Sequence, residues 1–230
     1  CHEEKGNVKA AMAQYEKVMS DYPDTIPAAY SEYALAYLNQ KQGDLYGALN
    51  LYSVIIAKYS IDELVRASHF MTAEIYTRLN RFSEASQTYS LIESRYPEDA
   101  DIARFMKAWC DSNNGNLEGA EAVYNGIISD EKSGRDLKAK STVKLGDLYF
   151  EKNNAALASK YYETAVKEFN DMAGIKAEAR YGLGWINYSA SRFDSARSEF
   201  DAAAREAASA GDEELKVRAL FMSANSLYGA

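Results

Sequence analysis

Residues suited to metal binding or nucleophilic catalysis are few in this 230-residue chain and lie far apart in the sequence. Its two histidines, His2 and His69, have no cysteine or aspartate at the spacing of a metal site, and Cys1 and Cys110 are too few for a disulfide framework. A reactive thiol needs cationic neighbours, and Lys107 alone gives Cys110 little such support. We therefore expect Cys110 to be a small buried hydrophobe, and the chain to have no metal, cofactor or catalytic residue.

Two glycine-containing stretches and two acidic runs also lack the context that chemistry would require. "EKGNV" and the "GLG" of "YGLGWINY" follow no predicted strand, so neither is a phosphate-binding loop. Gly182 and Gly184 are instead expected to permit close helix contact. The runs "DEELK" and "ESRYPEDAD" lie at predicted helix ends, where solvated carboxylates are common. These stretches are therefore interpreted as structural.

The composition excludes several classes of protein. The net charge is -8 and no basic stripe is present, so nucleic acid is not an expected partner. No stretch approaches 18 uncharged apolar residues, which predicts no membrane span. Three prolines, thirteen glycines and the absence of strand signals favour long helices with short breaks. The sequence thus predicts an all-α protein with 47% hydrophobic residues to form its core.

An alanine followed four residues later by an aromatic residue recurs six times. The pairs are Ala11/Tyr15, Ala48/Tyr52, Ala85/Tyr89, Ala120/Tyr124, Ala158/Tyr162 and Ala196/Phe200. Successive alanines are 37, 37, 35, 38 and 38 residues apart. A polar turn such as "QGDL" or "NGNL" precedes each pair, and its glycine or asparagine tolerates the left-handed conformation that ends a helix. This period predicts a series of helix-turn-helix units.

A second small residue precedes these alanines at a regular distance. It lies twelve residues earlier in four copies, at Ala73, Ala108, Gly146 and Gly184. Ala34 takes this place fourteen residues before Ala48, because we interpret "NQKQGD" as a loop with two additional residues. Small side chains on both helices of a hairpin allow their backbones to approach closely. We therefore expect both sets of small residues to be at helix contacts.

In these features the chain resembles tetratricopeptide repeats, helix-turn-helix units of about 34 residues. The likeness is closest in "TVKLGDLYFEKNNAALASKYYETAVKEF", where the family positions are held by Leu145, Gly146, Tyr149, Ala158, Tyr162 and Ala165. Pro23 and Pro97 close a unit as the family does. The chain departs from the family pattern at Ser60, Lys132 and Asn170, where the closing proline is usual, and at Asp111 and Asn187, where the first helix usually has an aromatic residue. The resemblance covers essentially the whole chain and places His69 where a packing aromatic is usual.

The resemblance implies an all-α, right-handed α-solenoid of antiparallel helix hairpins. It predicts a single solenoid over 1–230, with a second helix at 1–23, full repeats at about 27–60, 63–97, 101–132, 136–170 and 174–210, and a further first helix at 213–230. Because the terminal helices have no hairpin partners, we interpret the chain as a fragment of a longer array. The alternative is that Cys1 is the lipidated first residue of a mature lipoprotein.

The hairpin ends "SDYPDT" and "SRYPED" resemble those of bacterial envelope repeat proteins, which favours a periplasmic or envelope location over the alternative, the cytoplasm. Some members of the family hold a partner's C-terminal carboxylate in a basic clamp. Here Lys140 and Lys144 are followed on the next first helix by Glu178 and Tyr181, so that clamp is not expected.

In such a solenoid the first helix of each hairpin lines a concave groove. The sequence predicts that a partner contacts an aromatic stripe there, formed by Phe70, Phe105, Trp109, Phe150, Tyr181, Trp185, Tyr188 and Phe221. The alternative for a bulky residue at helical spacing is core packing, which we favour for Met71, Met106 and Met222. Nearby charges, Lys140, Lys144, Asp147 and Glu178, are expected to set the register of the partner.

These patterns predict a non-catalytic scaffold for protein-protein interaction, which binds a partner peptide or segment in the aromatic groove. The alternative is a structural assembly subunit that self-associates or stacks through uncapped repeat ends, where Leu220 and Phe221 would be exposed.

Overall fold

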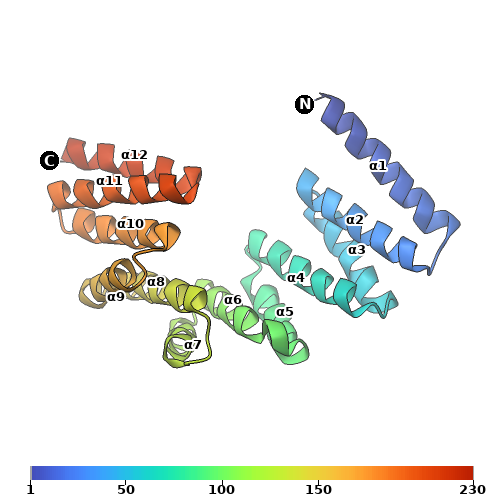
Figure 1. Cartoon of the computed structure of the whole chain (residues 1–230), viewed down its shortest axis with the longest axis horizontal. Helices are drawn as coiled ribbons and strands as arrows, with labels where there is room; N and C mark the ends of the chain where they lie inside the picture. The colour runs from blue at the N-terminus through green and yellow to red at the C-terminus, as the bar shows by residue number, and fades with distance from the viewer. Residues whose placement is uncertain (1, 230) are drawn as a thin grey trace. The chain divides into compact units, whose positions relative to one another are not determined.

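A computed structural model describes residues 2–229, and the side chains of residues 7–229. The expectations for Cys1 and for the His2 side chain lie outside these described residues. Across residues 2–229 the fold is all-α with no strand, and the helices form antiparallel hairpins of the α-solenoid type (Figure 1). None of the described helices combines the length and the apolar character that a bilayer span requires.

The helices fall into two compact units, Cys1–Asn114 and Gly115–Ala230. Unit 1 contains α1 (His2–Asp21), α2 (Ile26–Gln42), α3 (Leu45–Lys58), α4 (Asp62–Arg78), α5 (Phe82–Arg95), the short 3-10 helix η1 (Pro97–Asp99) and α6 (Ala100–Asn113). Unit 2 contains α7 (Leu117–Ser129), α8 (Arg135–Glu151), α9 (Ala155–Glu168), α10 (Ala173–Ser189), α11 (Phe193–Ala210) and α12 (Glu213–Gly229). The division falls inside the repeat predicted over 101–132, and the single solenoid over 1–230 stays a prediction.

The turns within the hairpins share one backbone device. A residue with a left-handed conformation lies five positions before each of the five later repeat alanines, at Gly43, Asn80, Gly115, Asn153 and Ser191. In four of these turns the following amide donates to a carbonyl five residues back, as Arg81 N does to Tyr76 O at 2.8 Å and Arg192 N to Asn187 O at 2.9 Å. This is the Schellman arrangement, which satisfies carbonyls that the helix end leaves without partners. These four turns therefore share one geometry, and the fifth shares the left-handed residue.

The core of unit 1 forms where each second helix packs between two first helices. Ala48, Tyr52 and Ile55 of α3 lie with Ala36 of α2 and Ile75 of α4, and all five side chains are inaccessible to solvent. Tyr89 of α5 takes the corresponding place between α4 and α6. The Ala11/Tyr15 pair of α1 is only half-buried, unlike the five later pairs.

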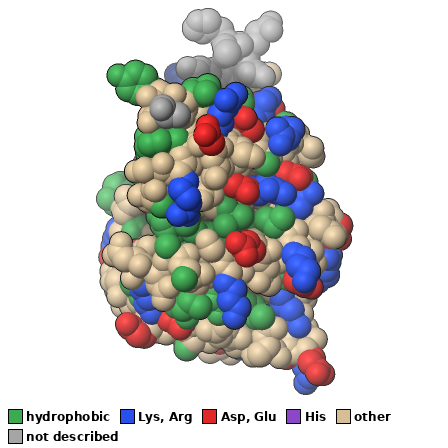
Figure 2. Space-filling view, turned by 90° about the vertical axis from the view of Figure 1, so that its left-hand side faces the viewer, with side chains coloured by type: hydrophobic (Ala, Val, Ile, Leu, Met, Phe, Trp, Pro, Cys, Tyr) green, Lys and Arg blue, Asp and Glu red, His purple; other side chains and the backbone are tan. Residues whose placement is uncertain are grey.

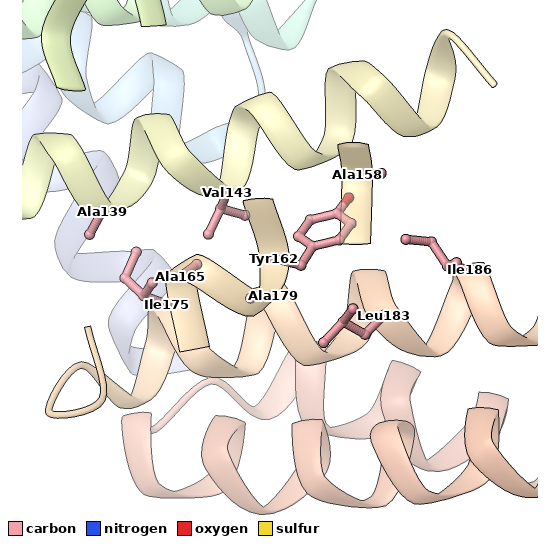
Figure 3. Packing of buried hydrophobic residues seen from close by; sticks show 9 residues of the cluster. All are labelled: Ala139, Val143, Ala158, Tyr162, Ala165, Ile175, Ala179, Leu183 and Ile186. Carbon is pink, nitrogen blue, oxygen red and sulfur yellow. The ribbon is translucent and has the colours of Figure 1, made fainter. Parts of the chain in front are cut away.

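Unit 2 repeats this packing around Tyr162 of α9. The side chains of α8 and α10 converge on its ring, with Val143 on one side and Leu183 on the other (Figure 3). A Cβ atom at Gly146 of α8 or at Gly182 of α10 would overlap the ring. Likewise, a Cβ at Gly184 would lie only 2.5 Å from Cε1 of Phe200 on α11. The expectation that these glycines permit close helix contact is therefore confirmed.

One detail of the repeat alignment is wrong. Ala36, twelve residues before Ala48, packs with Ala48 and Tyr52, whereas the predicted residue Ala34 is half-buried and lines an apolar hollow beside Ala11. Only Gly43 and Asp44 lie between α2 and α3, whereas the turns of the later hairpins each contain three residues, so "NQKQGD" contains no additional loop residues. Alanine occupies both positions of α2, so only packing distinguishes them.

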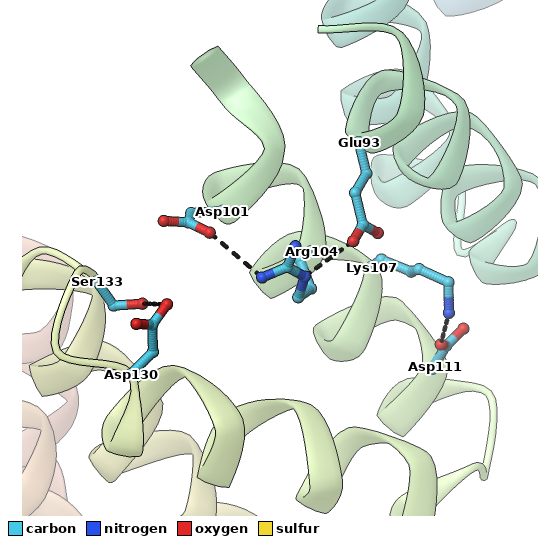
Figure 4. A network of polar contacts seen from close by, with 7 residues as sticks. All are labelled: Glu93, Asp101, Arg104, Lys107, Asp111, Asp130 and Ser133. Atoms are coloured by element: carbon cyan, nitrogen blue, oxygen red, sulfur yellow. Dashed lines mark hydrogen bonds and ion pairs between the residues drawn. The ribbon is translucent and has the colours of Figure 1, made fainter. Parts of the chain in front are cut away.

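The residues considered for chemistry have structural surroundings. Cys110 is buried with its Sγ 3.7 Å from Thr77 Oγ1, and burial raises the pKa of its thiol. Lys107 pairs with Asp111 (Figure 4). Cys110 is therefore the small buried side chain that the sequence predicts.

Ion pairs between helices lie mainly at the surface. Arg104 of α6 contacts Glu93 of α5, with Nε and Oε1 2.8 Å apart (Figure 4). Its Nη1 also lies 3.3 Å from Oδ1 of Asp101, one turn away on the same helix. All three side chains keep more than a quarter of their surface exposed. Exposed ion pairs of this kind each contribute about 0–1 kcal/mol to the free energy of unfolding, so apolar packing is the main source of stability.

The turn geometry predicts the effect of substitutions at its left-handed residue. Ser191 has φ of 57°, a conformation that disfavours residues with a Cβ atom, whereas the equivalent Gly43 has φ of 88°. Ser191→Gly should raise the free energy of unfolding by about 0.5–1 kcal/mol, and Gly43→Ala should lower it by a similar amount. Urea unfolding followed by circular dichroism measures both. If Ser191→Gly lowers the free energy of unfolding instead, the serine side chain stabilises the turn by more than its backbone strain destabilises it.

The surroundings of His69 predict a pH effect. Its ring is buried beside Tyr96, its Nε2 has no hydrogen-bond partner among the described residues, and burial and Arg95 lower its pKa. The unfolded chain therefore binds a proton more readily than the native chain, so stability should fall as pH decreases below about 6.5. Between pH 7.5 and 5.5 the free energy of unfolding of His69→Phe should therefore fall less than that of the parent protein, as measured by urea unfolding. An equal loss in both proteins would contradict the assignment.

Candidate partner-binding groove

Unit 2 contains a hollow of about 460 Å³ on the side of its first helices. It is lined by Lys144, Asp147 and Phe150 of α8, Tyr162 of α9, Glu178, Tyr181, Gly182 and Trp185 of α10, and Asp212, Glu214, Leu215 and Arg218 at the start of α12. Hydrophobic side chains are also exposed among acidic and basic ones on the face drawn in Figure 2. The hollow is within the size range of small-ligand pockets, about 300–1,000 Å³, which also suits a few side chains of a peptide.

Packing between successive first helices creates this hollow. Helix α10 contacts both α8 and α12, so residues one turn apart on α10 face into the space between its neighbours. Tyr162 reaches the hollow from behind, because its ring passes between Gly146 and Gly182. Its hydroxyl donates to Asp147 Oδ1 at 2.7 Å, which links the core to the charged rim.

The aromatic residues of α10 form a connected ladder. The Trp185 ring makes edge-to-face contacts with Tyr181, Tyr188 and Phe200, at centroid separations of 6.3, 5.8 and 6.2 Å. Tyr181 and Trp185 are half-buried and pack against the cluster of Ala196, Phe200 and Met222. Each ring therefore has one edge in the core and the other at the hollow, where a partner could contact it.

The charges of the hollow interact with one another. Lys144 Nζ lies 2.8 Å from Asp147 Oδ2 and 4.0 Å from Glu178 Oε2. Burial lowers the pKa of Lys144, but these two carboxylates outweigh that effect and the pKa is raised overall. Burial also raises the pKa of Glu178; Lys144 opposes this change, whereas Asp147 adds to it. The ammonium therefore stays charged, and the carboxylates repel one another.

The structure separates the predicted aromatic residues into three groups. Phe150, Tyr181 and Trp185 line the hollow of unit 2. Tyr188 is outside the lining and packs on Phe193, with centroids 5.4 Å apart, and Phe221 is 64% exposed on α12.

The remaining predicted aromatics belong to unit 1. Phe70 and Trp109 are half-buried against its core, where Trp109 meets Phe82 edge-to-face. Phe105 keeps only 7% of its surface exposed, so it offers little area to a partner.

Met71, Met106 and Met222, each of which directly follows a phenylalanine in the sequence, have the packing role that the sequence favoured. Met222 is buried beside Phe200, and Met71 and Met106 are half-buried against the two cores of unit 1. The flexible thioether fills the gap between adjacent hairpins. In the last copy the phenylalanine, Phe221, is exposed while its methionine is buried, so the pair does not act as a unit.

Several residues of the hollow were not predicted as site residues. Tyr162 was interpreted as core alone, and Asp212 and Glu214 as solvated helix-end carboxylates of "DEELK". Asp212 does cap α12, since its Oδ1 accepts from Leu215 N at 2.9 Å. Arg218 lies over the Tyr181 ring at 5.2 Å from its centroid. The signal for these three charged residues was their place at the start of a first helix, whose N-terminal turns face the preceding one.

Within the part of the chain that the structure describes, no group of three or more His, Cys, Asp or Glu side chains is arranged to hold a metal ion.

Comparisons with known proteins agree with this architecture. Two family models described as tetratricopeptide repeat match residues 143–212 and 1–25. A tetratricopeptide repeat protein from Parabacteroides merdae ATCC 43184 is similar in structure, with a TM-score of 0.62 and 14% identity over 96% of this chain and 93% of the other. The chain is thus a tetratricopeptide repeat protein.

Other solved structures share the fold at equally low identity. The apo form of the quorum sensor NprR from B. thuringiensis has a TM-score of 0.71 and 17% identity, over 96% of this chain and 65% of that protein. BtubC from P. vanneervenii has a TM-score of 0.63 and 19% identity, over 90% of each chain. No curated protein matches in sequence. At these identities the likeness shows the fold alone.

Proposed function

We propose that this protein is a non-catalytic scaffold that binds a segment of a protein partner in the hollow of unit 2. The observation that carries the proposal is the pair of half-buried rings, Tyr181 and Trp185, beside Phe150 in a hollow of about 460 Å³. Large aromatic side chains held rigidly by packing are the residues most enriched at the energetic centres of interfaces. A segment lying along α8, α10 and α12 would contact all three rings.

The comparisons support the class of function. Tetratricopeptide repeat proteins are in general scaffolds that bind proteins or peptides, and one protein of similar fold is a quorum sensor. In unit 1, Phe70 and Trp109 remain proposed contacts for an additional part of the partner. The single uninterrupted solenoid and the bacterial envelope location also remain predictions from the sequence.

Substitution of Trp185 tests the proposed site. Peptides selected from a phage-displayed random library against the intact chain would serve as probes, with affinity measured by isothermal titration calorimetry. Trp185→Ala should weaken their binding by about tenfold or more, because truncation of a central aromatic costs about 2 kcal/mol. Circular dichroism would establish that the variant retains its helices.

Tyr188→Ala is the matched control, because Tyr188 belongs to the same ladder but lies outside the hollow. It should destabilise the fold and leave peptide affinity near that of the parent protein. Equal affinity of Trp185→Ala and the parent protein would place the site elsewhere. Loss of binding only in proportion to loss of folded protein would show that Trp185 acts through the core.

A second candidate function is self-association, which the outer face of α12 favours. Val217, Leu220, Phe221, Leu227 and Tyr228 occupy one face of this helix and are 49–96% exposed. An exposed stripe of this size would bury apolar surface against a second copy. Sedimentation velocity over a range of concentrations should then show a dimer or larger species, and Leu220→Asp with Phe221→Ser should abolish it. A monomer at all concentrations would eliminate this alternative.

A further inference from the structure

The hollow of unit 2 combines aromatic walls with an excess of negative charge. Four carboxylates line it against two cationic side chains. The carboxylates come from three separate segments of the chain, Asp147 from α8, Glu178 from α10, and Asp212 and Glu214 from the start of α12. The excess is therefore a property of the assembled hollow and not of one acidic run.

Both cationic side chains already have partners. Lys144 is held between Asp147 and Glu178, with Nζ–O separations of 2.8 and 4.0 Å. The Arg218 guanidinium lies on the Tyr181 ring, 5.2 Å from its centroid. An anionic group entering the hollow would have to displace these contacts and would meet the surrounding carboxylates.

The carboxylates are less well compensated than the cations. The nearby Lys216 pairs with Glu213 and not with Glu214, and Asp212 uses Oδ1 to cap α12. The pKa of Glu178 is raised by burial, and Asp147 and Asp212 raise it further although Lys144 opposes them. A cation placed in the hollow would stabilise all of these groups in their charged form.

The aromatic rings are suited to the same occupant. The faces of Tyr181 and Trp185 carry the negative part of the ring quadrupole, which attracts a cation within about 6 Å of the centroid. Arg218 on Tyr181 shows that a guanidinium fits on a ring of this hollow. Leu215 and Phe150 supply apolar surface for the aliphatic stem of a long basic side chain.

We propose that the partner segment places a lysine or arginine side chain in this hollow, so that the protein selects a basic segment and rejects an acidic one. This inference rests on the proposed function, since it gives the chemistry of the partner at the same site. The sequence predicted that nearby charges set the register of the partner more than its affinity; in the assembled hollow they also decide which partner is accepted.

Three synthetic peptides test the selection by charge. The first is an N-acetylated, C-amidated hexapeptide of alternating arginine and leucine; the others carry glutamine or glutamate in place of arginine. The chain has two tryptophans, so Trp109→Phe assigns the Trp185 indole signal in a ¹H–¹⁵N NMR spectrum. The arginine peptide should shift the Trp185 signal and bind about tenfold or more tightly than the glutamine peptide, whereas the glutamate peptide should leave the signal unchanged.

Charge variants of the protein test the same selection by changing the hollow instead of the peptide. Glu178→Gln and Glu214→Gln should each weaken the arginine peptide about two- to fivefold, and Lys144→Gln should strengthen it. Glu151→Gln, an exposed residue of α8 outside the hollow, is the matched control and should have no effect. Higher salt should weaken binding to the parent protein and have less effect on the Glu178→Gln variant.

The outcomes separate this inference from the proposed function. Binding of the glutamate or glutamine peptide as tightly as the arginine peptide, or unchanged affinity in Glu178→Gln, would overturn the selection of a basic segment and leave the scaffold in place. The absence of a Trp185 shift with all three peptides would also overturn it. The proposed function fails separately, if library-selected peptides bind Trp185→Ala as well as the parent protein.

Discussion

The structure depends on one recurring contact, the insertion of an aromatic ring from a second helix between two flanking first helices. In unit 2 the Tyr162 ring occupies the space that Cβ atoms at Gly146 and Gly182 would fill, and Phe200 has the same relation to Gly184. Small residues on the first helices and an aromatic residue on the second are therefore required together. This joint requirement explains why the two kinds of residue keep a constant spacing along the chain.

The same contact brings the first helices close enough to form the groove. Because α10 packs against α8 and α12, its exposed side faces a hollow with walls on both sides. Tyr181 and Trp185 lie at this junction and belong to the core and to the hollow at once. A ring fixed in this way loses little conformational freedom when a partner binds, which favours affinity. Under the proposed function, packing and recognition are thus two consequences of one arrangement, and a single substitution would affect both.

Charged side chains interact more strongly in the hollow than at the solvent-exposed surface. The Arg104 pairs with Glu93 and Asp101 lie in solvent, which screens them. In the hollow, partial burial raises the pKa of Glu178 and lets carboxylates of three segments influence one another. Under our proposal, charges that add little to stability therefore determine which partner is accepted.

The sequence by itself determined the all-α fold, the hairpin period and most of the close-contact residues, because helix packing imposes a local spacing that recurs in every unit. It also indicated Phe150, Tyr181 and Trp185, which share a face of their helices. Tertiary structure decided what spacing could not: that Ala36 and not Ala34 meets Tyr52, and that Phe105 is buried. It alone brought Asp212, Glu214 and Arg218 beside residues of α8 and α10, since proximity between separate helices depends on how the hairpins stack.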